Sequence, residues 1–164
     1  MPWVSPPRFT DMMEETVPFQ LMTLENDENV MPLVEAELNG FPIRLVVDTG
    51  ASHTCIDKTA FRRCALSKKN GIGHLRHSVE DGEPDTVMGL GGRRLSHSFN
   101  TVDVLRLGVL EVISYQVVVV RLTNINRMLH LIGKDPIDGL LGCDLLTQYH
   151  ARMDFESQTI SFQY

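Results

Sequence analysis

Cysteine is scarce in this sequence, with three residues among 164, at Cys55, Cys64 and Cys143. The number is odd and no two of them are close together, which argues against a disulfide framework and favours a reducing compartment. Taken with the six histidines, they show none of the spacings that hold a metal ion. The sequence therefore predicts neither a disulfide framework nor a metal site.

Long apolar runs and clusters of basic charge are also missing. No run approaches the roughly 18 apolar residues of a membrane-spanning helix. The first residues include Pro2, Pro6, Pro7 and Asp11 but lack the basic-then-apolar pattern of a signal peptide. The net charge is -6 and the basic residues are scattered, which argues against nucleic acid as the main partner. We therefore expect a cytoplasmic protein with neither membrane nor nucleic acid among its partners.

The length and the ordinary apolar content predict one domain with its own hydrophobic core. Residues 1–16 carry prolines and acids with little periodicity, so we expect an N-terminal arm followed by a single domain at 17–164. Period-two alternation and turn signals predict a mostly β chain, with strands at 17–24, 34–38, 41–47, 54–56, 101–107, 109–120, 151–155 and 159–162. Short helices are expected at 58–66 and 143–149, a glycine-tipped hairpin at 86–99, and loops at 67–85 and 123–136.

Three local signals are sharper than the rest. Asn39-Gly40 is a strong signal for a tight hairpin turn between strands 34–38 and 41–47. Asp57 has the side chain of an N-cap and directly precedes the first expected helix. The four valines at 117–120 predict a strand that is buried on both faces.

One stretch joins an apolar strand to a carboxylate: Leu45-Val46-Val47 runs directly into Asp48-Thr49-Gly50-Ala51-Ser52. An unpaired charge at the end of a buried strand is costly, so such a carboxylate needs support from its surroundings. Gly50 allows backbone amides to approach it, and the Thr49 hydroxyl can tie the loop to another group. A carboxylate held rigidly in this way is suited to chemistry. The plainer alternative is a turn aspartate that accepts backbone amides.

Asp48-Thr49-Gly50-Ala51 after an apolar strand resembles the active-site loop of the aspartic peptidases. Two further motifs make the resemblance more specific. The stretch 87–92, Val-Met-Gly-Leu-Gly-Gly, resembles the glycine-rich flap of the retroviral-type, retropepsin-like branch, and 137–142, Ile-Asp-Gly-Leu-Leu-Gly before a short helix, resembles its C-terminal motif. Three motifs in order and at fitting spacing are far more specific than one. The resemblance implies a closed retropepsin-like β-barrel with one or two short helices and one active-site aspartate per chain.

The resemblance also implies a function, that of an aspartic endopeptidase without metal or organic cofactor. Its chemistry needs two carboxylates that share one proton, one acting as general base on water and the other as general acid. Asp138 and Asp144 do not fit the family's pattern, so a homodimer with one Asp48 from each chain is implied, acting on a peptide or protein substrate. The implied site residues are Asp48, Thr49 and Gly50 for catalysis, and Ala51, Ser52, Met88, Gly89, Leu90, Gly91 and Gly92 for substrate binding, with Leu141 and Gly142 bracing the loop.

The sequence departs from the family at three positions. Many retroviral enzymes have an aspartate where this chain has Ser52 and an arginine where it has Cys143, and these two form an ion pair beside the active site. Since both are absent here, the dimer is expected to depend on other contacts, with strand 159–162 as a candidate. Ala51 stands where pepsin-like relatives often carry a hydroxyl that donates to the catalytic aspartate, so we expect a working range from mildly acidic towards neutral pH.

Two other functions are compatible with parts of the sequence. The chain can be a catalytically silent peptide-binding or assembly module on the same fold, because a fold does not guarantee activity. The glycine-rich stretch 88–92 can also be a phosphate-cradling loop, but such a loop should open a helix, and Arg93-Arg94-Leu95-Ser96 has no helical start. His53 lies beside the active-site loop and is assigned no role, because the aspartic mechanism does not need one.

Overall fold

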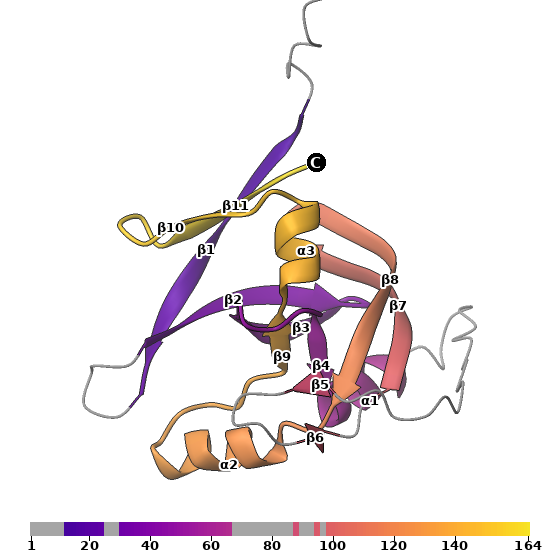
Figure 1. The fold of residues 1–164 in the computed structure, drawn as a ribbon, viewed down its shortest axis with the longest axis vertical. Helices are drawn as coiled ribbons and strands as arrows, with labels where there is room; N and C mark the ends of the chain where they lie inside the picture. Colours follow the sequence, from indigo (N-terminus) through magenta and orange to yellow (C-terminus); the bar gives the residue numbers. More distant parts are fainter. Residues whose placement is uncertain (1–11, 25–29, 67–86, 89–93, 96–97) are drawn as a thin grey trace, which may run out of the picture.

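The fold is that of a computed structural model that describes residues 12–24, 30–66, 87–88, 94–95 and 98–164 (Figure 1). The loop expected at 67–85 and the glycine-rich stretch 89–92 lie outside these residues. The strands are β1 (Glu14–Thr23), β2 (Val30–Leu38), β3 (Phe41–Val47), β4 (Cys55–Asp57), β5 (Val87–Met88), β6 (Arg94–Leu95), β7 (Ser98–Leu107), β8 (Leu110–Val120), β9 (Gly139–Leu141), β10 (Arg152–Asp154) and β11 (Thr159–Gln163). The helices are α1 (Lys58–Leu66), α2 (Thr123–Leu131) and α3 (Cys143–Gln148). Within the described ranges no helix has the length and apolar character needed to cross a bilayer.

Six strands close into a barrel, in the neighbour order β2-β3-β9-β4-β8-β7, and β7 returns to pair with β2. The closed, mostly β fold expected from the sequence is thereby confirmed. At its centre β3 and β9 run parallel, with Leu45 opposite Gly139 and Val47 opposite Leu141. The end of β3 is covered on both faces, which explains why Leu45, Val46 and Val47 are all apolar.

The turn between β2 and β3 forms where the sequence predicts it. Asn39 has φ 52° and Gly40 has φ 84°, the left-handed conformation that glycine and asparagine adopt most readily. The Asn39 side-chain oxygen also accepts hydrogen bonds from the backbone amides of Asp103 and Val104, each at 3.1 Å. The residues that set the register of β2 and β3 therefore also attach this hairpin to β7, where the barrel closes.

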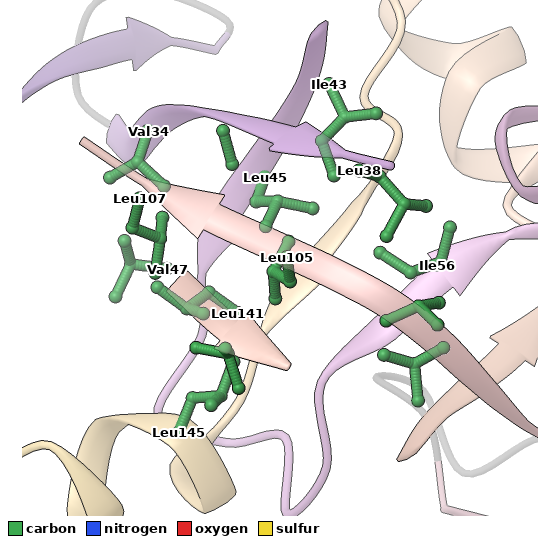
Figure 2. Close-up of a cluster of buried hydrophobic side chains, with 14 of the residues drawn as sticks. Val34, Leu38, Ile43, Leu45, Val47, Ile56, Leu105, Leu107, Leu141 and Leu145 are labelled. Atoms are coloured by element: carbon green, nitrogen blue, oxygen red, sulfur yellow. The ribbon is translucent and has the colours of Figure 1, made fainter. Parts of the chain in front are cut away.

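Apolar side chains from the barrel strands fill its interior, and the close-up of this core shows them facing one another across it (Figure 2). Members with no measurable exposure include Val34, Leu38, Leu45, Ile56, Leu105, Leu107, Leu141 and Leu145. All four valines at 117–120 are buried, as expected for a strand covered on both faces. Leu145 extends the core into α3, which directly follows β9 (Figure 2). The short helix beside the Asp48 loop is thus anchored by the same core as the barrel.

The chain ends form a second sheet of three strands in the order β10-β11-β1, which continues into the barrel because β1 also pairs with β2. It lies at the end of the barrel where α3 stands (Figure 1). One of its faces carries Val17, Ile160 and Phe162, which are buried against the barrel core. β1 begins at Glu14 and not at Val17 as expected, because residues 14–18 pair with β11. A strand partner at the opposite end of the chain leaves no local signal at residue 14.

Helix α2 corrects the sequence analysis, which expected a loop throughout 123–136. The helix has no capping side chain, since Leu122 occupies its N-cap, and its first residues Thr123 and Asn124 are poor helix formers. Packing stabilises it: Leu129 is buried in a second apolar cluster beside the barrel, with Ile125 and Ile132 packed against that cluster. Tertiary contact here outweighs weak local propensity.

Candidate active site

Asp48 lies directly after β3 and is half-buried. Its backbone amide donates to the carbonyl of Leu141 at 3.0 Å, and its side-chain Oδ1 accepts the amide of Gly50 at 2.8 Å. A Cβ on Gly50 would come within 3.1 Å of the same Oδ1, so glycine gives the carboxylate its close backbone donor. The carboxylate is therefore fixed from one side while part of it stays accessible.

The middle of the loop is held by Cys143, the first residue of α3. Its backbone amide donates to the carbonyl of Ala51 at 2.8 Å, and its Sγ donates to the carbonyl of Thr49 at 3.1 Å. Cys143 stands where the sequence resemblance would place the arginine of an ion pair. In this protein a thiol and a backbone amide contact the loop directly.

The far end of the loop is held by Asp144. The Thr54 amide lies 2.9 Å from both carboxylate oxygens, and the Thr54 hydroxyl donates to Oδ1 at 2.8 Å. The Tyr115 hydroxyl donates to Oδ2 at 2.5 Å, and the Leu145 amide donates to Oδ1 at 2.8 Å. These donors engage both oxygens, so Asp144 is committed to holding the far end of the loop. The sequence analysis missed this contact, because 90 residues separate Thr54 from Asp144.

Two glycines of the C-terminal motif are needed for close packing of backbone. A Cβ on Gly139 would lie 2.1 Å from the carbonyl oxygen of Cys55, and one on Gly142 would lie 2.4 Å from the carbonyl carbon of His53. Any larger residue would push β9 away from β4, or α3 away from the loop. Leu141 and Gly142 are thus placed to brace the loop as expected. Leu141 accepts the Asp48 amide, and Gly142 lets α3 pack against the His53 backbone.

Burial and nearby carboxylates keep two titratable groups around the loop neutral. Burial, followed by the charges of Asp144 and Asp48, raises the pKa of the Cys55 thiol to about 11. Burial, followed by the hydrogen bond to Asp144, raises the pKa of the Tyr115 phenol well above its ordinary value. The Tyr115 hydroxyl therefore keeps its proton, and its role as a donor, throughout the physiological pH range.

At the exposed rim of the loop, Ser52 Oγ lies 3.0 Å from His53 Nδ1. The imidazole ring of His53 meets the Phe99 ring edge-on, with 5.8 Å between the ring centroids. These contacts give His53 a fixed place beside the loop, which the sequence did not indicate.

Of the residues expected at the site, the structure brings Asp48, Thr49, Gly50, Ala51 and Ser52 together in one loop. Met88 ends β5, which pairs antiparallel with β6 so that Met88 lies opposite Arg94, as expected for the base of a hairpin. Gly89, Leu90, Gly91 and Gly92, the expected tip of the flap, lie outside the described residues.

Comparison with known proteins agrees with this geometry. Residues 34–145 match the family model described as aspartyl protease. A search of curated protein sequences finds no match. Among solved structures, the fold is similar to the EIAV protease in complex with the inhibitor HBY-793, with a TM-score of 0.50, 16% identity, and coverage of 81% of this chain and 100% of that one.

Two further structures match with lower TM-scores. A retropepsin-like aspartic protease from Rickettsia conorii has a TM-score of 0.48 and 18% identity, with 93% and 94% of the two chains covered. The retroviral protease-like domain of Ddi1 from Leishmania major has a TM-score of 0.48 and 16% identity, with 80% and 87% covered. The matched family model spans more than half of the chain and includes both the Asp48 loop and the start of α3. The chain belongs to the aspartyl protease family and has the retropepsin-like fold.

Proposed function

We propose that this protein is a homodimeric aspartic endopeptidase. The observation that carries the proposal is the Asp48 loop, in which a half-buried carboxylate accepts the Gly50 amide while its backbone is fixed to Leu141. Such rigid placement of a single carboxylate at a strand end suits the activation of water. Membership of the aspartyl protease family supports the same chemistry.

The mechanism needs two copies of this carboxylate. One Asp48 would act as general base on a water molecule, and the other, carrying the shared proton, would act as general acid on the carbonyl oxygen of the peptide bond. The described donors around Asp144 and Asp138 leave neither acid in a position like that of Asp48. Thr49 is exposed in the protomer, where its hydroxyl is available to join the two loops across a dimer axis.

The terminal sheet is the part of the protomer best suited to contact a second copy. Strand β11 pairs with β1 on one side and β10 on the other, so residues 159–162 already have strand partners within the protomer. Among the described strands, β10 is an outer edge of the sheet, and residues 14–18 of β1 pair with β11 alone. An open strand edge is a template for pairing with another chain. We therefore place the dimer contact at these edges and not on β11 itself.

Replacing Asp48 by asparagine tests the proposal. The asparagine side-chain oxygen can still accept the Gly50 amide, so the variant should fold and dimerise, but it cannot act as a general base. We expect kcat/KM on a denatured mixed-protein substrate, or on a peptide derived from it, to fall by about a thousandfold or more. Asp135→Asn, at a carboxylate that is 86% exposed, is the matched control and should cleave like wild type.

A peptidic, hydroxyl-containing mimic of the transition state should inhibit the wild type. Cleavage by purified Asp48→Asn at a rate near that of the wild type would refute the aspartic mechanism. A wild type that binds the mimic but cleaves nothing would point to the silent peptide-binding module.

A further inference from the structure

Asp144 is the meeting point of three elements around the active-site loop. Its own helix supplies the Leu145 amide, the segment entering β4 supplies the Thr54 amide and hydroxyl, and β8 supplies the Tyr115 hydroxyl. Hydrogen bonds to a carboxylate are stronger than those between neutral groups. One side chain therefore ties the loop's far end both to α3 and to the barrel wall.

Thr54 transmits this attachment to the loop. It has no exposed surface, and its hydroxyl accepts the Gly142 amide at 3.1 Å while donating to Asp144. Its backbone carbonyl accepts the amide of Val118 at 3.0 Å. Only residues 49–53 separate Thr54 from Asp48, so any shift of Thr54 must be absorbed within that short stretch.

The approach of Tyr115 to Asp144 depends on an unusual backbone position in β8. Leu110 and Val112 are buried before this point, whereas Tyr115 and Val117 face inward after it, so the inward face changes from even to odd residues. The change occurs at Ser114, whose φ of 52° lies in the left-handed region that serine rarely adopts. Strain of this kind persists where the surrounding structure holds it in place, often near functional sites.

We propose that Tyr115 and Asp144 are positioning residues, which fix Thr54 and through it the orientation of the Asp48 carboxylate. Neither residue touches substrate in this proposal, and the inference rests on the proposed peptidase function. Loss of the Tyr115 hydroxyl would leave Asp144 and Thr54 paired, but Asp144 would lose its hydrogen bond to β8, and Thr54 would keep only the bond from the Val118 amide to its carbonyl. The loop would then sample orientations in which the Asp48 carboxylate is misplaced, and small misplacements of a catalytic group lower kcat strongly.

The test compares Tyr115→Phe and Asp144→Asn with the control Tyr149→Phe. Tyr149 is a partly buried tyrosine that packs against the same core, and no described hydrogen bond joins its side chain to Asp144. Titration with the peptidic transition-state mimic counts competent sites, so that unfolded protein does not lower kcat. We expect Tyr115→Phe to lower kcat per competent site about tenfold with KM changed less than about twofold, and Tyr149→Phe to change neither.

Adding Tyr115→Phe to Asp144→Asn should lower kcat by less than the product of the two single losses, because both variants weaken the same connection. A kcat per competent site within about twofold of wild type in Tyr115→Phe would overturn the proposal, even if that variant melted earlier.

A second measurement separates this proposal from the peptidase function. Amide hydrogen exchange at 49–54 should become about tenfold faster in Tyr115→Phe and stay unchanged in Tyr149→Phe, whether or not the protein cleaves peptides. If the wild type cleaves no peptide and exchange at 49–54 is still faster in Tyr115→Phe, the positioning role is supported and the peptidase function is refuted. Unchanged exchange would refute the positioning role.

Discussion

Replacing Asp57 by alanine should destabilise the fold strongly, because one carboxylate there serves two elements. Asp57 is the last residue of β4 and is 7% exposed. Its Oδ2 accepts the Thr59 amide at 2.8 Å, as an N-cap of α1, and its Oδ1 accepts the Leu122 amide at 2.8 Å, beyond the end of β8. The side chain thus satisfies donors on two segments, one of which lies 65 residues further along the sequence.

The magnitude follows from these two losses. Removing an N-cap side chain typically costs about 1 kcal/mol. Leaving the buried Leu122 amide without its acceptor costs a further 1–3 kcal/mol, roughly. Together they predict a loss of about 2–4 kcal/mol in the free energy of unfolding. In a domain of this size that corresponds to a Tm lower by about 5–15 °C.

Urea unfolding followed by circular dichroism at pH 7, with a thermal scan, measures the loss. The matched control is Asp135→Ala, whose carboxylate is 86% exposed and lies 3.6 Å from Arg44, and it should remain within about 0.5 kcal/mol of wild type. If Asp57→Ala also stays within about 0.5 kcal/mol, the reasoning from the two hydrogen bonds is refuted.

Three further predictions concern activity. Specific activity should fall on dilution through the dimer dissociation constant, as followed by sedimentation and cleavage on the same samples; full activity of a strict monomer would contradict the shared site. Ala51→Ser should move the profile of kcat/KM against pH to lower pH, because a hydroxyl donor favours the ionised carboxylate; an acidic optimum in wild type that the substitution leaves unchanged would contradict this. Gly142→Ala should lower kcat and Tm together, because its Cβ would lie 2.4 Å from the His53 backbone. A variant with wild-type kcat and Tm would show that the loop can move away from this Cβ at no cost.

The parts of the fold that the sequence predicts correctly are those with a local signal. Asn39-Gly40 has the residues that its left-handed turn requires, and Asp57 has the side chain and spacing of the cap it forms. The Asp48 loop could be predicted for the same reason, since Gly50 lies two residues from the oxygen that its amide contacts.

The features that the sequence does not reveal depend on distant partners. Helix α2 lacks a capping side chain and is stabilised by the packing of Leu129, so its local sequence predicts a loop. The contact of Asp144 with Thr54 and Tyr115 joins three separate elements, and no local sequence pattern around these residues predicts it. Residues 14–16 read as part of an arm for the same reason, because their strand partner is at the other chain end.

Under the proposed mechanism, the pairing of β11 inside its own protomer has a consequence for when activity would begin. Because β1, β10 and β11 pair with one another within one chain, we expect the protomer to fold without its partner. Under the proposed mechanism, each newly made chain is then folded but inactive until it binds a second copy. The concentration of the chain, without any change of fold, would then determine when proteolysis begins. Because the dimeric fraction rises with concentration, every added copy would also raise the activity per chain.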